Sequence, residues 1–157
     1  MTQSIILACG NPLRGDDGAA LRVVCGLQEG YTDPETEICC AQQWTPDLAE
    51  SISKSQLAIF VDASAAIPPG AIRLVALSGR CEPPGLTTHS LSPERLLGLS
   101  LELFQKVPER AFLLTIGGAS FEHGDQLSDS VQKAVPAACN QLKALLSGVT
   151  LPDSPQF

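Results

Sequence analysis

Short, continuously apolar runs alternate with segments of helical spacing along almost the whole chain. The runs at 3–9, 57–62 and 112–116 lack the polar alternation of a half-exposed strand, which indicates strands buried on both faces. The expected elements are strands at 3–9, 35–41, 57–62, 71–77 and 112–116 and helices at 17–29, 45–54, 92–106 and 127–147. We therefore expect an α/β fold, a single-domain three-layer α/β/α sandwich with a mostly parallel, twisted sheet of about five strands.

Length and charge limit the organisation and the partners of the chain. Its 157 residues suit one domain, which we place at 1–150, and the two prolines of the remaining tail, 151–157, predict a frayed end. A hydrophobic content of 44% is sufficient for a buried core. The net charge of −7 argues against nucleic acid or an anionic membrane as the main partner, because either would require a basic face.

The cellular compartment is predicted from what the sequence lacks. It shows neither a secretory signal nor an apolar run approaching the roughly 18 residues that span a membrane, which predicts a cytoplasmic protein. Six cysteines are present without any C-x-x-C spacing. We therefore expect reduced and mostly buried thiols rather than disulfides.

Acidic side chains and histidines gather after the expected strands. Asp16 and Asp17 follow the first strand, Asp62 ends the third, and His89 precedes the third helix. Because the carboxyl ends of parallel strands meet at one edge of the sheet, where such folds bind ligands, we expect the carboxylates to converge. Two carboxylates and one imidazole suit a divalent transition metal with open coordination positions, and the same groups also suit proton transfer.

Each of these residues also has a purely structural interpretation. Asp16 or Asp17 fits the N-cap of the following helix, where a carboxylate satisfies free backbone N–H groups. Asp62 fits a turn at the end of its strand, and His89 fits an ordinary surface loop. His123, in the loop after the fifth strand, is interpreted as a surface residue.

Four motifs together resemble those of a known family. The stretch GNPLRGDDG at 10–18 resembles the N-terminal signature of the [NiFe]-hydrogenase maturation endopeptidases, which remove a C-terminal extension from the precursor of the hydrogenase large subunit. LAIFVDA, TTHSLSPERLL and TIGGASFEHGDQLSDSV match the later anchors of the same pattern. Element order and spacing agree from residue 3 to about residue 147.

The resemblance implies roles for particular residues. Asp17, Asp62 and His89 fall on the positions that contact nickel already bound to the substrate, and they are the expected catalytic residues. Asn11 and Asp16 fall on supporting positions. The implied enzyme is a monomer that holds no permanent cofactor, because the large-subunit precursor supplies the nickel.

One segment departs from the best-known family pattern. Members often carry an acid and Gly-Gly after the second strand, where this chain has Cys40-Ala41-Gln42-Gln43. The stretch QQWTPDLAE resembles the branch that serves cytosolic bidirectional or cofactor-linked hydrogenases. Gln42, Gln43 and Trp44 are therefore candidates for substrate specificity, although packing is favoured for Trp44, the only tryptophan.

The family is often classed with aspartic-type peptidases, but Asp17 and Asp62 lack the Asp-Thr-Gly context of pepsin-like enzymes. An acid-and-histidine set favours attack by water, with Asp17 or Asp62 as general base. Two other functions remain open from the residues. A phosphoreceiver-like signalling domain would form an acyl phosphate on Asp62, and a small-molecule metallohydrolase would carry its own metal.

Overall fold

The computed structural model describes residues 3–78 and 91–148. Five strands form one sheet in the order β2-β1-β3-β5-β4, in which only β4 runs antiparallel to its neighbour. The strands are β1 (Ser4–Cys9), β2 (Thr36–Ala41), β3 (Leu57–Ser64), β4 (Ile72–Ala76) and β5 (Arg110–Gly117). The helices are α1 (Ala19–Gly30), α2 (Leu48–Ser53), α3 (Pro93–Phe104) and α4 (Asp129–Leu146), with a 3₁₀ turn, η1 (Gly15–Gly18), before α1.

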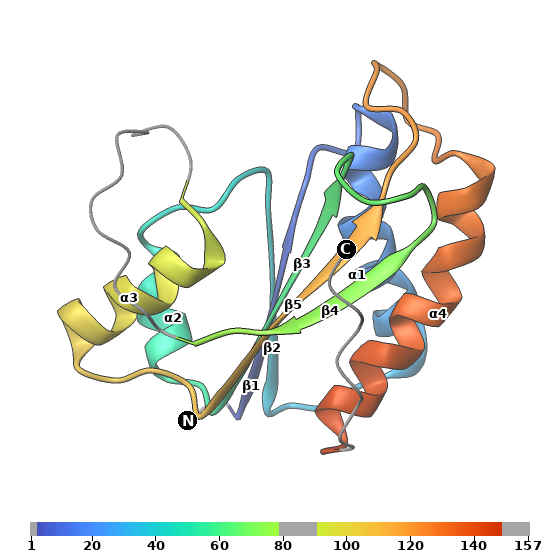
Figure 1. Ribbon diagram of the computed structural model, residues 1–157. Helices are drawn as coiled ribbons and strands as arrows, with labels where there is room; N and C mark the ends of the chain where they lie inside the picture. The colour runs from blue at the N-terminus through green and yellow to red at the C-terminus, as the bar shows by residue number, and fades with distance from the viewer. Residues whose placement is uncertain (1–2, 79–90, 149–157) are drawn as a thin grey trace.

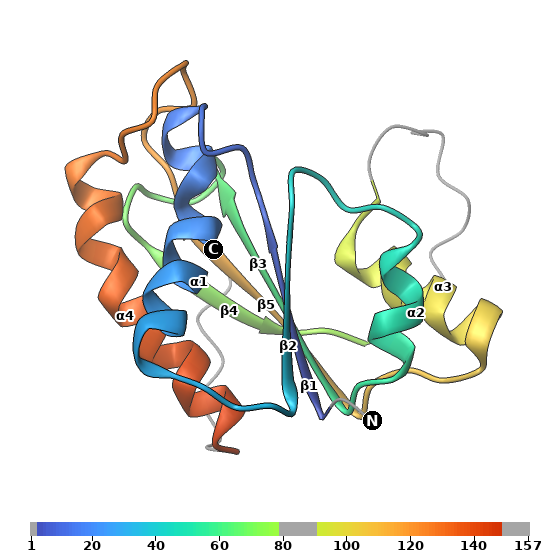
Figure 2. The same cartoon turned by 180° about the vertical axis from the view of Figure 1, so that it is seen from behind.

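The helices cover both faces of the sheet. Figures 1 and 2 show α1 and α4 on one face and α2 and α3 on the other. Successive strand residues point to opposite faces, so Ile59 joins the apolar core under α1 and α4 while Phe60 joins the core under α2 and α3. The expected three-layer sandwich with a mostly parallel sheet is confirmed.

Several element boundaries differ from the expectation by a few residues, and three of these differences have a clear structural cause. The helix expected from residue 17 begins with the η1 turn, so α1 starts at Ala19. The helix expected from residue 45 starts at Leu48, whose N–H donates to the Thr45 carbonyl oxygen in a preceding turn. β3 continues past Asp62 because its last two residues still pair with β5.

Ser92 and Pro136 occupy notable positions in the helices. The Ser92 hydroxyl caps α3 by accepting a hydrogen bond from the Arg95 N–H at 3.1 Å. Pro136 lies inside α4, which continues through it. None of the helices in the described part of the chain has the length and apolar character needed to cross a membrane.

The described cysteines, Cys9, Cys25, Cys39, Cys40 and Cys139, are all free. The expectation that the thiols are mostly buried is wrong for Cys25 and Cys40, which are exposed. Cys81 and the expected frayed tail, 151–157, lie outside the described residues.

Candidate functional site

The loop that leaves β1 is folded around Asp17. A Cβ atom at Gly10 would collide with the Asp17 carbonyl oxygen, so only glycine allows this close approach. The Asn11 N–H donates to the Asp17 carboxylate at 2.8 Å, and the Asn11 side-chain oxygen accepts from the Leu13 N–H at 2.9 Å. The Gly-Asn pair of the motif therefore fixes the position of the second aspartate.

Asp16 is completely buried and joins two loops that are distant in sequence. Its carboxylate accepts hydrogen bonds from the N–H groups of Ala119, Ser120 and Ser128 and from the Ser128 hydroxyl, at 2.7–3.0 Å. Burial acts to raise the pKa of Asp16, but the hydrogen bonds outweigh it and the pKa lies below its ordinary value. Asp16 is therefore held as a carboxylate inside the protein.

The capping interpretation of the aspartate pair is wrong for α1. Gly18 is the N-cap residue of α1, and no side chain accepts a hydrogen bond there. Asp16 instead binds Ser128, which is the N-cap residue of α4. The two aspartates therefore differ: Asp16 is buried and joins two loops, whereas Asp17 is partly exposed.

Asp62 lies on the sheet face under α2 and α3, near the carboxyl end of β3. Burial raises the pKa of Asp62 to about 6, and the negative charges of Asp17 and Glu94 contribute to the increase. A hydrogen bond from the Thr115 hydroxyl and the positive charge of Arg73 act in the opposite direction. Asp17 and Asp62, 45 positions apart in sequence, thus lie within electrostatic range of each other.

Two further features surround the carboxylates. Oδ1 of Asp62 is buried and has no hydrogen-bond partner among the residues that the structure describes, so its capacity to accept a hydrogen bond is unused there. Cys9 lies on the same sheet face at the end of β1, and burial together with the charges of Asp62 and Asp17 raises the pKa of its thiol to about 11. The thiol is therefore protonated near neutral pH and is a poor nucleophile.

The histidine of the expected ligand set, His89, lies outside the described residues. Within 3–78 and 91–148, no group of three or more His, Cys, Asp or Glu side chains has an arrangement that could hold a metal ion. His123 is exposed, as its surface interpretation predicts. Asp62 does not form a turn, because β3 continues for two residues beyond it.

The segment after β2 lies beside the aspartate loop. The Gly10 N–H donates to the Ala41 carbonyl oxygen at 3.0 Å, which fixes the start of this segment next to the loop. Gln42 and Gln43 are exposed. Trp44 packs edge-to-face on Phe60 with ring centroids 5.4 Å apart, so its favoured packing role is observed.

Sequence reasoning missed Thr115, Arg73 and Glu94, the polar residues around Asp62. Thr115 is paired with Asp62 across β3 and β5, and Arg73 is paired with Thr115 across β5 and β4. The one sequence feature that could have indicated Thr115 is that it is a threonine within the otherwise apolar run at 112–116. Its pairing with Asp62 and Arg73 can be recognised only once the strand order is known.

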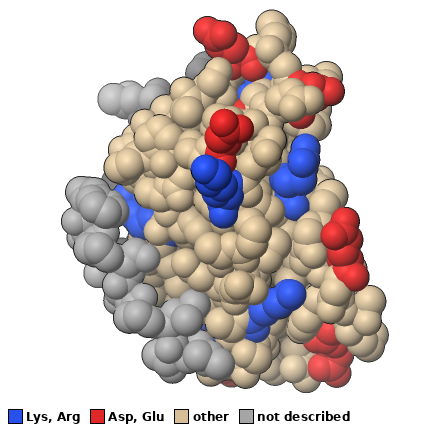
Figure 3. All heavy atoms as spheres, turned by 90° about the vertical axis from the view of Figure 1, so that its right-hand side faces the viewer, with Lys and Arg blue, Asp and Glu red and all other residues tan. Residues whose placement is uncertain are grey.

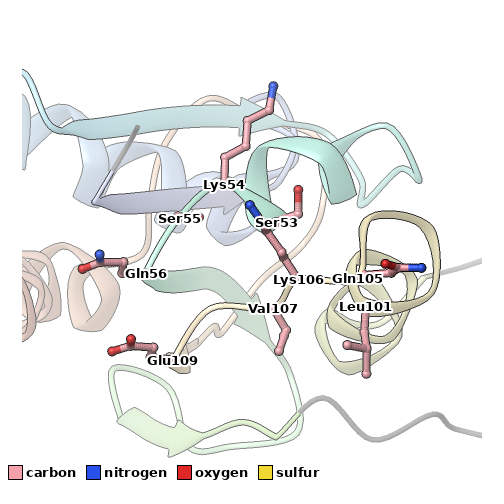
Figure 4. Close-up of a pocket in the computed structure, with 9 residues that line it drawn as sticks. All are labelled: Ser53, Lys54, Ser55, Gln56, Leu101, Gln105, Lys106, Val107 and Glu109. Atoms are coloured by element: carbon pink, nitrogen blue, oxygen red, sulfur yellow. The ribbon is translucent and has the colours of Figure 1, made fainter.

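A pocket lies at the opposite end of the sheet from the candidate site, where the parallel strands begin. This pocket, of about 580 Å³, is formed where α2 ends, β3 and β5 begin and α3 ends (Figure 4). Its lining residues are Ser53, Lys54, Ser55, Gln56, Leu101, Gln105, Lys106, Val107 and Glu109. None of the expected site residues lines this pocket.

On a different face of the molecule, around α4, acidic and basic side chains are interspersed (Figure 3).

No protein-family model matches the chain, and no curated protein matches it. Solved structures do match. The hydrogenase maturating endopeptidase HybD from E. coli has a TM-score of 0.74 and 24% identity over 93% of each chain. The [NiFe] hydrogenase maturation protease HycI from Thermococcus kodakarensis KOD1 has a TM-score of 0.73 and 19% identity, also over 93% of each chain.

The solution structure of an endopeptidase from Escherichia coli gives a TM-score of 0.70 and 25% identity over 94% of each chain. These similarities extend over nearly the whole chain. The chain therefore has the fold of the hydrogenase maturation endopeptidases.

Proposed function

We propose that this chain is a [NiFe]-hydrogenase maturation endopeptidase, which cuts the C-terminal extension from a large-subunit precursor after nickel insertion. The observation that carries the proposal is the convergence of Asp17 and Asp62 at the carboxyl edge of a fold shared with such enzymes. We infer a monomer that acts in the cytoplasm on this precursor. We also propose that the substrate is a cytosolic bidirectional or cofactor-linked hydrogenase. This assignment rests on the QQWTPDLAE stretch, in which Gln42 and Gln43 are exposed.

In the proposed reaction, nickel is part of the substrate. Asp17 offers a partly exposed carboxylate, and Asp62 offers an oxygen that has no partner among the described residues, so both carry oxygen acceptors that a cation could occupy. With His89 they provide two hard oxygen ligands and one nitrogen ligand. The approach of a divalent ion also removes the repulsion between the two carboxylates.

We infer that water attacks the scissile peptide bond, with Asp17 or Asp62 accepting its proton. The Cys9 thiol, although adjacent, is held in its protonated form. A phosphoreceiver needs both acids of the first loop to remain accessible to a metal ion, whereas all four hydrogen bonds of buried Asp16 are internal. The endopeptidase proposal is therefore favoured over the signalling alternative.

The test is the mass of a nickel-loaded precursor after incubation with the protein. The wild type is expected to remove a C-terminal peptide, and Asp17→Asn, Asp62→Asn and His89→Ala are each expected to leave the precursor intact. Asp125→Asn, an exposed acid elsewhere, is the matched control and should process normally. Cleavage by Asp17→Asn at the wild-type rate would contradict the assignment within the aspartate pair.

A further inference from the structure

One row of polar side chains crosses three strands of the sheet. Asp62 on β3 pairs with Thr115 on β5, and Thr115 pairs with Arg73 on β4. Residues two positions away from this row, Phe60 and Leu113, belong to the core under α2 and α3. Because strand residues alternate between faces, the row faces the same side of the sheet as that core. Arg73 thus belongs to the same face as the candidate site.

Arg73 carries a donor that nothing in the described structure satisfies. Its Nε atom is buried and has no hydrogen-bond partner within 3–78 and 91–148, and the same holds for Oδ1 of Asp62. A buried donor without a partner is costly, and native proteins rarely keep one without a functional reason. The proposed function uses the Asp62 oxygen for nickel but leaves the Arg73 N–H unused.

The charge around Arg73 indicates what kind of acceptor it takes. Its positive charge stabilises the Asp62 carboxylate, and Asp17 and Glu94 also act on that carboxylate. Before nickel arrives, the charged groups that act on the Asp62 carboxylate are one arginine and two further acids, so negative charge is in excess around Asp62. A second carboxylate from a ligand would be repelled, whereas the neutral oxygen of a peptide carbonyl would not.

The distance between Asp62 and Arg73 along the row also fits a peptide carbonyl as the acceptor. Adjacent strands lie about 4.8 Å apart, so Asp62 and Arg73, separated by β5, are about 10 Å apart along the row. That distance corresponds to about three residues of an extended peptide. A substrate segment whose scissile bond lies at Asp62 therefore reaches Arg73 within a few residues.

We propose that Arg73 is a substrate-binding residue, whose buried Nε–H donates a hydrogen bond to a backbone carbonyl oxygen of the precursor segment that lies across Asp62. The inference rests on the proposed endopeptidase function and adds a contact to it. Because the contact is made to backbone, it holds the segment in place without selecting its side chains. Side-chain selection is left to other positions, including Gln42 and Gln43.

The experiment measures kcat and KM for cleavage of nickel-loaded precursor by the wild type, Arg73→Lys and Arg73→Met. Both variants are expected to raise KM about tenfold or more, since a hydrogen bond from a charged donor is lost. Arg73→Lys should change kcat less than about threefold, whereas Arg73→Met also removes the charge that stabilises the Asp62 carboxylate and should lower kcat as well. Arg73→Lys separates this role from charge balance, because lysine keeps the charge but lacks the Nε–H group. Arg110→Met, an exposed arginine at the other end of β5, is the control.

The outcomes separate the two proposals. If the wild type does not cleave the precursor, the proposed function fails and the Arg73 contact fails with it. If the wild type cleaves and Arg73→Lys has a wild-type KM, only the Arg73 inference is overturned. Should Arg73→Met fail to fold, as judged by circular dichroism, Arg73→Lys and competition by a synthetic peptide of the extension still decide. The peptide is expected to inhibit Arg73→Lys at least about tenfold more weakly than the wild type.

Discussion

Replacing Asp16 with asparagine tests how strongly this buried carboxylate joins the two loops. One oxygen, Oδ2, accepts from the N–H groups of Ala119 and Ser120 and from the Ser128 hydroxyl, and Oδ1 accepts from the Ser128 N–H. Asparagine keeps one acceptor oxygen. Its best orientation keeps the three bonds at the Oδ2 position and places an amide NH₂ against the Ser128 N–H.

The magnitude follows from that geometry. One hydrogen bond becomes a contact between two donors, and the other three lose the charge that roughly doubles the strength of such bonds. Together these losses predict that Asp16→Asn lowers the free energy of unfolding by about 4 kcal/mol. For a domain of this size the melting temperature should fall by roughly 10 °C.

Urea denaturation followed by the fluorescence of Trp44, the only tryptophan, measures the effect. Ser128→Ala removes a single hydroxyl donor and should cost only about 1 kcal/mol. The pKa of Asp16 lies below its ordinary value, so its contribution is present above the unfolded pKa and is lost as pH falls through the folded pKa. If Asp16→Asn is within 1 kcal/mol of the wild type at pH 7, the reasoning is refuted.

Three further predictions concern the surroundings of the site. The pKa of Asp62 is raised to about 6, so its ionisation destabilises the metal-free fold as pH rises from about 4 to 6. Asp62→Asn should therefore be more stable than the wild type above pH 6 by about 3 kcal/mol, with no difference near pH 3. A thiol reagent at pH 8, followed by peptide mapping, should label exposed Cys25 and Cys40 much faster than Cys9, whose pKa is about 11; equal rates would contradict the burial of Cys9. Trp44→Ala removes the edge-to-face contact with Phe60 and should cost about 2–3 kcal/mol in urea denaturation followed by circular dichroism, since the variant has no tryptophan. An unchanged midpoint would mean that the ring is not part of the core.

Much of the fold was predictable from local patterns. Continuous apolar runs identified β1, β3 and β5, because strands covered on both faces carry no polar alternation. The Ser92-Pro93 pair identified the start of α3. The start of α2 was misplaced, because Thr45 and Pro46 form a turn that leads into the helix rather than its first residues.

The site was predictable only in part, for reasons of distance along the chain. The sequence predicted that Asp17 and Asp62 converge, because strands of a parallel sheet end at a common edge. The partners of Asp16 lie 103 to 112 positions further along, and no local pattern points to them. Arg73 was missed because its place beside Thr115 depends on β4 joining the sheet next to β5, which apolar runs alone do not determine.

We propose that the enzyme meets nickel that its substrate already carries. The test is the intact mass of one large-subunit precursor, prepared with and without nickel, after incubation with the metal-free protein. We expect loss of the C-terminal extension from the nickel-loaded precursor and no change in the nickel-free one. Equal cleavage of both forms, or of neither, would contradict this proposal.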